Sequence, residues 1–189
     1  MNLEDEIKYC AKLLKQGKVI LYPTDTIWGV GCDATQPKAI DRIKKIKQRK
    51  TSKSMIVLLD DEKKLEKYVE HVPPIAFDLI LNSKSPLTIV YEGGRKLAKN
   101  LISKDGTIAI RIVNDRFTGP LIHQLGHPVV STSANISGML PPRAFNMISA
   151  ELINRVDYVV KHSRYTTRTM KASTIIKIEK DGRFSVLRP

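Results

Sequence analysis

The chain contains 189 residues, of which 42% are hydrophobic, and it carries a formal net charge of +13. This length is typical of one domain, so we expect a single folding unit over residues 1–189 with a continuous core. The excess of Lys and Arg indicates attraction to polyanions such as phosphates, nucleotides or RNA, without choosing among them. No apolar run approaches the roughly 20 residues that span a bilayer, and the first residues lack the cationic start and apolar core of a signal peptide. We therefore expect a soluble, cytoplasmic protein with no membrane association.

The sequence also lacks the common motifs of several enzyme classes. Cys10 and Cys32 lie in different predicted elements without a C-x-x-C spacing, which favours two buried thiols over a disulfide or a zinc site. The four histidines show no metal-ligand spacing. There is no G-x-x-x-x-G-K-[ST] phosphate loop, no G-x-G-x-x-G after a strand, no H-E-x-x-H and no G-x-S-x-G. A bound nucleotide would therefore be held by other means.

The first part of the chain predicts alternating helices and strands. Residues 3–16 predict a helix, because apolar side chains recur on one stripe and Gly17 follows as a stop. Residues 19–22 predict a short strand. Residues 33–37 offer capping side chains and a first-turn proline to a helix that runs through about residue 47, and residues 55–59 predict the next strand.

The rest of the chain continues this alternation. The predicted helices are residues 75–81, 117–125 and 145–152, and the predicted strands are residues 87–91, 107–112, 129–131, 158–160, 174–178 and 184–187. Asp181-Gly182 predicts a hairpin turn between the last two strands. The alternation predicts an α/β layer fold, and the terminal hairpin makes its sheet mixed rather than wholly parallel.

Three segments concentrate polar side chains. Residues 22–31, Y-P-T-D-T-I-W-G-V-G, suit a small polar ligand, although they also fit an ordinary connection between a strand and a helix. Lys47 and Arg49 end a helix, where they could neutralise a triphosphate together or simply complement the helix dipole. Residues 130–138, V-S-T-S-A-N-I-S-G, place four hydroxyls and an amide after a strand. That composition suits phosphate or ribose oxygens, and a serine-rich surface loop is the alternative.

Taken together, the motifs resemble a known family. The segments Y-P-T-D-T-I-W-G-V-G, K-Q-R, S-P-L-T, I-A-I-R, P-V-V-S-T-S-A-N-I-S-G, A-S-T-I-I and S-V-L-R-P occur in the order and spacing of the YrdC-like threonylcarbamoyl-AMP synthase family, over about residues 19–189. S-T-S-A-N-x-S-G combined with P-T-[DE]-T is specific, whereas K-x-R or L-R-P alone would be weak. The resemblance implies a single-domain α/β fold with a twisted mixed sheet, flanking helices and a basic concave face.

The resemblance also implies an activity. Members of the family are nucleotidyltransferases that form threonylcarbamoyl-AMP and pyrophosphate from ATP, L-threonine and bicarbonate, with Mg²⁺ expected alongside ATP. The product serves the threonylcarbamoyladenosine modification of tRNA, and partner proteins carry out the transfer to tRNA. Attack of a carbamate oxygen on the α-phosphorus builds negative charge, so we expect catalysis by cations and by positioning.

Site residues follow from the same resemblance. The catalytic pair is Lys47 and Arg49; the ATP contacts are Lys47, Arg49, Thr51, Thr107, Ser133, Asn135 and Arg188; and the L-threonine contacts are Thr24, Thr26, Arg111, Ser131 and Ser173. Metal ligands are not assigned. The sequence departs from the family pattern where Lys50, Ser54, Val113 and Ala172 replace common prolines and Trp28 replaces a tyrosine. These changes free loop backbone without removing a charged or hydroxyl group from the site.

Two alternatives remain open at this point. A non-enzymatic module that binds double-stranded RNA or tRNA is favoured by the net charge, although aromatics are only 6% of the residues and no RNA-stacking motif is recognisable. The second alternative is the carbamoyl-transfer role of related domains in hydrogenase maturation. Those domains lie in long multidomain chains with zinc-binding cysteines.

Overall fold

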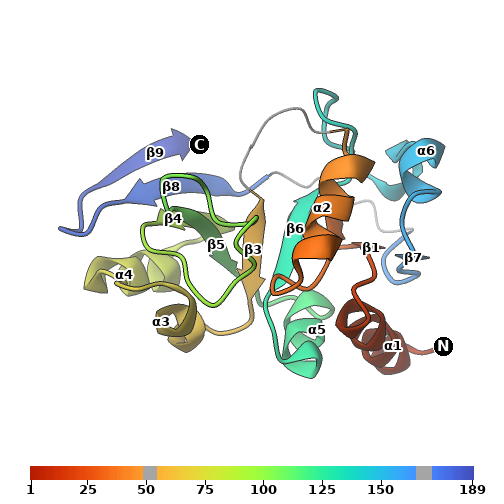
Figure 1. Cartoon of the computed structure of the whole chain (residues 1–189), viewed down its shortest axis with the longest axis horizontal. Coiled ribbons are helices and arrows are strands. Elements are labelled where there is room, and N and C mark those ends of the chain that lie inside the picture. Colours follow the sequence, from red (N-terminus) through yellow and green to blue (C-terminus); the bar gives the residue numbers. More distant parts are fainter. Residues whose placement is uncertain (49–54, 165–171) are drawn as a thin grey trace.

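The computed structural model describes residues 1–48, 55–164 and 172–189, and its strands form one mixed sheet (Figure 1). The strands are β1 Ile20–Tyr22, β2 Gly29–Gly31, β3 Ile56–Leu59, β4 Leu87–Tyr91, β5 Ile108–Ile112, β6 Val129–Ser133, β7 Tyr158–Val159, β8 Thr174–Ile178 and β9 Phe184–Arg188. The helices are α1 Leu3–Lys15, α2 Pro37–Ile46, α3 Leu65–Tyr68, α4 Pro74–Asn82, α5 Thr118–Leu125 and α6 Ala150–Ile153, with 3₁₀ turns at Glu62–Lys64 and Phe145–Met147. The predicted α/β class with a mixed sheet is confirmed.

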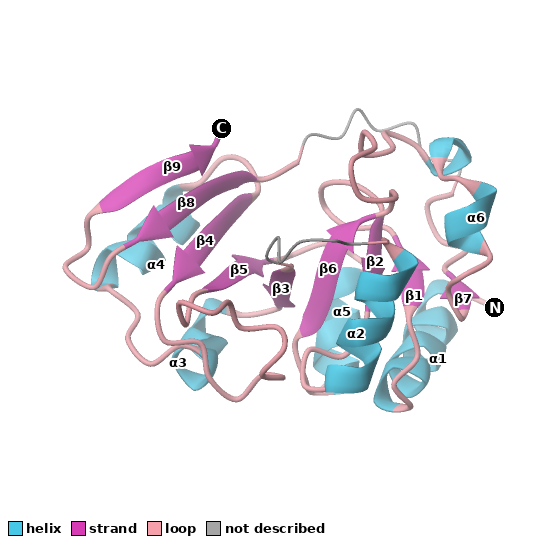
Figure 2. Cartoon of the chain, turned by 45° about the horizontal axis from the view of Figure 1, so that its top comes forward, coloured by secondary structure: helices cyan, strands magenta, loops and turns pink. Residues whose placement is uncertain are grey.

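The strand order brings segments that are distant in sequence next to one another. Within the described residues it reads β7-β1-β2-β6-β3-β5-β4-β8-β9. β3 pairs with β5 and β4 pairs with β8 in parallel, whereas β2 and β3 each pair with β6 in the antiparallel sense. The amino-terminal strands and the carboxy-terminal hairpin therefore lie on opposite sides of the central β6, β3 and β5 (Figure 2).

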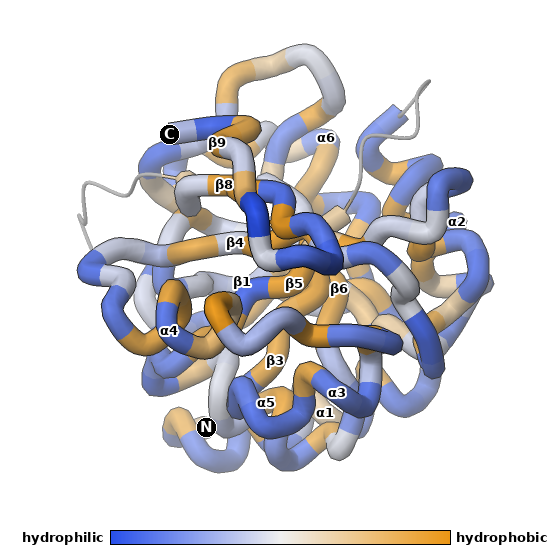
Figure 3. The backbone as a smooth tube through the Cα atoms, turned by 90° about the vertical axis from the view of Figure 1, so that its left-hand side faces the viewer, coloured by the Kyte–Doolittle hydropathy of each residue, from blue (hydrophilic) through white to orange (hydrophobic). Residues whose placement is uncertain are grey.

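Two clusters of buried side chains hold the helices against the sheet. Successive residues of β1 alternate between them, since Ile20 packs with α1 and α5 and Leu21 packs with α2. On α2, Ile40 and Ile43 are fully buried, as the predicted apolar stripe requires. Figure 3 shows the result, with hydrophobic segments in β3 and β5 inside and hydrophilic loops outside. Among the described residues, no helix is long and apolar enough to cross a membrane.

Three predicted details differ from the structure. The predicted helix at 145–152 is broken into a 3₁₀ turn and α6, because the Ser149 hydroxyl accepts the Leu152 N–H and starts a new helix. The N-cap of α2 is Gln36, which makes no side-chain capping bond. The carboxylate of Asp33 is occupied elsewhere, by the backbone N–H and hydroxyl of Thr35. The first-turn position of Pro37 is as predicted.

Candidate functional site

A cavity of about 580 Å³ opens between β2 and β6 on one side and β4, β5 and the β8–β9 hairpin on the other. Its volume is in the range of small-molecule sites. Its polar lining includes Thr26, Thr107, Arg111, Ser131, Ser133, Ser173 and Arg188, all expected as ligand contacts from the sequence. Its apolar lining includes Ile56, Val90, Ala109, Ile175 and Leu187. Hydroxyls and guanidinium groups therefore share one cavity with an apolar wall.

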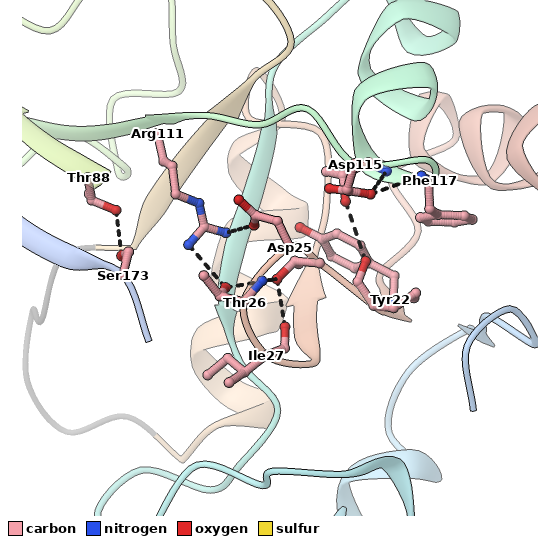
Figure 4. Close-up of polar contacts among 12 residues, drawn as sticks. Tyr22, Asp25, Thr26, Ile27, Thr88, Arg111, Asp115, Phe117 and Ser173 are labelled. Carbon is pink, nitrogen blue, oxygen red and sulfur yellow. Dashed lines mark hydrogen bonds and ion pairs between the residues drawn. The ribbon is translucent and has the colours of Figure 1, made fainter. Parts of the chain in front are cut away.

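The turn after β1 is fixed by a directed chain of hydrogen bonds (Figure 4). The hydroxyl of Thr24 donates to the Ile27 carbonyl at 2.7 Å, so its single proton is already used. The hydroxyl of Thr26, 2.9 Å away, is therefore the donor to Thr24. Its oxygen in turn accepts a bond of 3.1 Å from Nη1 of Arg111. Both threonines of the T-D-T motif thus bind the protein itself and orient the turn.

Arg111 contributes a buried cation to the cavity wall. It lies on β5, its side chain is only 4% exposed, and its Nη2 lies 3.0 Å from Oδ1 of Asp25. Its Nε has no hydrogen-bond partner among the described residues. Burial raises the pKa of Asp25, the positive charge of Arg111 opposes that rise, and Asp115 adds to it. A buried guanidinium with donor capacity left over suits an anionic ligand.

A second arginine reaches the same cavity from the last strand. The guanidinium of Arg188 donates to the Ser173 carbonyl at 2.7 and 3.1 Å, and the Ser173 hydroxyl lies 2.7 Å from the hydroxyl of the fully buried Thr88. Burial lowers the pKa of Arg188, and the like charge of Arg111 lowers it further. Both guanidinium groups line the same cavity, where their like charges favour an anionic ligand.

A β-bulge brings Arg188 and its neighbour to the cavity together. In the ladder between β8 and β9, Ile175 pairs with Arg188 and Ile176 pairs with Val186, so Leu187 is an extra residue. In a regular strand, successive side chains point to opposite faces. Because of the bulge, Leu187 and Arg188 both line the cavity. The bulge thus places the apolar side chain of Leu187 next to the cationic side chain of Arg188 in the cavity wall.

Lys47 fixes the loop after β6 through hydrogen bonds from its ammonium group. This lysine is only 2% exposed, and its ammonium group donates to the carbonyls of Ser133 and Asn135 and to the side-chain oxygen of Asn135. The hydroxyl of Ser133 also donates to the side-chain oxygen of Asn135. In this structure Lys47 and Asn135 lie outside the lining of the 580 Å³ cavity, while Ser133 is part of it. Lys47 thus anchors the loop that presents Ser133.

Two glycines of β2 make room for polar side chains of the site. A Cβ atom on Gly29 would lie 2.7 Å from the hydroxyl oxygen of Ser131, and one on Gly31 would lie 2.3 Å from the Val130 carbonyl oxygen and 2.7 Å from the ring of Tyr22. All three distances are shorter than van der Waals contact. Residues 22–31 were predicted to form either a ligand-binding segment or an ordinary connection, whereas Gly29–Gly31 form a strand whose lack of side chains admits Ser131.

A smaller cavity of about 360 Å³ lies beside the first. Thr24 and Asp25 line it, together with Asp115, Arg116 and His162, and Trp28 lines both cavities. Of the expected threonine contacts, Thr24 therefore lies at the smaller cavity and Thr26, Arg111, Ser131 and Ser173 at the larger one.

Several expected residues cannot be placed, and others were not foreseen. Arg49 and Thr51 lie outside the described residues, as do Lys50 and Ser54. No role was predicted for Asp25, Thr88 or Leu187, although the motifs T-D-T, S-P-L-T and S-V-L-R-P contain them. Among the described residues, no group of three His, Cys, Asp or Glu side chains is arranged to hold a metal ion.

The fold and this cavity define the class of the protein. The Sua5/YciO/YrdC family model, described as "Telomere recombination", matches residues 12–189, and the chain belongs to this family. It is 32% identical to a threonylcarbamoyl-AMP synthase of Pseudoalteromonas translucida (strain TAC 125), over 85% of this chain and 87% of that protein.

Solved structures of Sua5 and YciO proteins have a similar fold. The crystal structure of P. abyssi Sua5 complexed with L-threonine has a TM-score of 0.89 and 25% identity, and the match covers 98% of this chain and 54% of that one. The crystal structure of E. coli YciO has a TM-score of 0.84 and 26% identity, and the match covers 98% of this chain and 89% of that one. This chain therefore spans about half the length of the Sua5 protein and most of YciO.

Proposed function

We propose that this chain is a threonylcarbamoyl-AMP synthase, a nucleotidyltransferase that converts ATP, L-threonine and bicarbonate into threonylcarbamoyl-AMP and pyrophosphate. The product would serve the threonylcarbamoyladenosine modification of tRNA, with separate proteins transferring the group. The observation that carries the proposal is the cavity in which Arg111 and Arg188 face hydroxyl groups and an apolar wall. Its cations suit a carboxylate and phosphates, and its apolar wall suits a base.

In this proposal, L-threonine and ATP bind in different parts of the cavity. The threonine carboxylate would bind Arg111, with Ser131 and Ser173 within the same lining, and Thr26 would hold that arginine in place. Thr24 would act indirectly, through its hydrogen bond with Thr26. The nucleotide would extend past Thr107, Ser133 and Arg188, with Asn135 supporting Ser133.

The reaction needs two bond-forming steps. The threonine amine and bicarbonate form a carbamate with loss of water, and a carbamate oxygen then attacks the α-phosphorus of ATP while the bond to pyrophosphate breaks. Negative charge accumulates on the phosphates, so fixed cations are the main catalytic resource. We assign this role to Arg49 with Lys47, whose ammonium also fixes the loop that carries Ser133. Arg49 and Thr51 are proposed from the sequence motif alone.

Mg²⁺ is proposed as the companion of ATP. In nucleotide sites this ion is commonly held by phosphate oxygens, several waters and one or two carboxylates, rather than by a dedicated protein cage. Asp105 is a carboxylate in the cavity lining, and the hydroxyl of Thr107 donates to it at 2.7 Å. That hydrogen bond lowers the pKa of Asp105 and favours its charged form. The ion would supply charge neutralisation on the triphosphate.

The test is pyrophosphate release from ATP with bicarbonate, measured with and without L-threonine, together with detection of threonylcarbamoyl-AMP by mass spectrometry. The proposal expects release that depends on threonine. Turnover without threonine dependence would favour a carbamoyl-transfer role instead. RNA binding without any turnover would favour the RNA-binding module, which the net charge of +13 supports. The cytoplasmic location and the partner proteins are predictions of the same proposal.

A further inference from the structure

Asp25 is placed where the walls of the two cavities meet. Its side chain is 22% exposed and lines the smaller cavity, whereas its ion-pair partner Arg111 lines the larger one. Figure 4 shows the guanidinium of Arg111 between the Asp25–Thr26 turn and the Thr88–Ser173 pair. Asp25 therefore approaches Arg111 from the side of the smaller cavity and leaves the larger one to a ligand.

Arg111 needs such a partner for electrostatic reasons. A buried cation without a counter-charge is strongly disfavoured, because it has lost its hydration. One hydrogen bond that Arg111 donates to the neutral hydroxyl of Thr26 does not replace that hydration, and the positive charge of Arg188 acts in the opposite direction. The carboxylate of Asp25, 3.0 Å from Nη2, supplies the missing negative charge. It also fixes the plane of a long side chain that would otherwise have several rotamers.

We propose that Asp25 is a positioning residue for substrate binding, which holds the Arg111 guanidinium against its repulsion by Arg188 so that its remaining donors face the larger cavity. This inference rests on the proposed function, in which Arg111 binds the threonine carboxylate. Asp25 itself touches no substrate. Its effect on binding passes through Arg111, which makes the coupling between the two residues measurable.

A purely electrostatic role for Asp25 predicts the opposite change in threonine affinity, so the direction of the measured change distinguishes the two roles. A fixed carboxylate repels an incoming carboxylate, so a purely electrostatic role would make threonine bind more tightly once Asp25 is neutralised. A positioning role predicts weaker binding, because the guanidinium loses its fixed orientation. Asp25→Asn removes the charge but keeps an oxygen beside Nη2, and Asp25→Glu retains the charge. Together with Asp25→Ala, these substitutions therefore rank differently under the two roles.

The experiment is calorimetric titration of L-threonine into the full chain, with Asp78→Asn as the matched control. Asp78 is an exposed aspartate on α4. We expect at least a tenfold loss of threonine affinity in Asp25→Ala, a smaller loss in Asp25→Asn, and affinity within about threefold of the original in Asp25→Glu and in the control, since 1.4 kcal/mol corresponds to tenfold. ATP affinity should stay within about threefold in all variants.

A double-mutant cycle tests whether Asp25 acts through Arg111. Arg111→Ala alone should weaken threonine binding, and adding Asp25→Ala to it should change the affinity by less than about twofold. Unchanged or tighter binding in folded Asp25→Ala would overturn the inference, as would a full additive loss in the double variant. If urea unfolding shows that Asp25→Ala does not fold, the nearly isosteric Asp25→Asn carries the comparison. Failure of the unmodified chain to bind threonine would overturn the proposed function itself.

Discussion

Replacing Lys47 with alanine tests whether its ammonium group holds the loop after β6. The group is buried and donates to three oxygens of Ser133 and Asn135. Hydrogen bonds to charged donors contribute about 1.5–3 kcal/mol each, and they are not additive. Lys47→Ala removes all three hydrogen bonds that the ammonium group donates to these oxygens. The substitution should therefore lower the free energy of unfolding by about 3–5 kcal/mol.

Urea unfolding of the ligand-free protein measures this loss. With a slope of about 2 kcal/mol per molar, the midpoint should fall by roughly 1.5–2.5 M. Lys45→Ala is the control, because Lys45 is exposed in the last turn of α2, two residues before Lys47, and its loss should change the stability by no more than about 0.5 kcal/mol. If Lys47 served only to bind phosphate, the ligand-free midpoint would not move. An unchanged midpoint would therefore refute the role of this ammonium as the anchor of the loop.

Three further outcomes are expected. Valine, which lacks the threonine hydroxyl, should bind at least tenfold more weakly than threonine by calorimetry; equal affinities would place the hydroxyl outside the site. Gly31→Ala should lower the thermal midpoint, because its Cβ would lie 2.3 Å from a backbone carbonyl, while Gly119→Ala, with 3.7 Å available, should not. Threonine binding should weaken as pH falls through the raised pKa of Asp25, because the protonated group loses its ion pair with Arg111. Calorimetric titrations at decreasing pH measure this, and Asp25→Asn should remove the dependence. The effect on stability has the opposite sign. Burial raises the pKa of Asp25 and Asp115 adds to the rise, so the folded state binds the proton more tightly than the unfolded state. The resulting contribution to stability is present below the ordinary value of 3.8 and declines as pH rises through the raised value.

Local patterns in the sequence were enough to predict most elements. The strand at Thr174–Ile178 and the helix that begins at Leu3 lie where periodicity and turn residues indicated, because both signals are local along the chain. The motifs also predicted seven polar residues that the larger cavity brings together. Neither signal revealed β2, because Gly29–Gly31 is short and has no side-chain pattern. Its pairing with β1 and β6 decides its conformation.

The sequence by itself therefore determined the α/β class, the family and the chemical types of the site residues. Only the tertiary structure decided what each residue contacts. Asp25 and Arg111 are 86 positions apart in sequence order, and their ion pair exists because the turn after β1 meets β5 across the sheet. Leu187 lines the cavity because one ladder contains a bulge. Lys47 faces the loop after β6 because α2 ends beside it. Such contacts depend on the packing of distant segments, which no local pattern encodes.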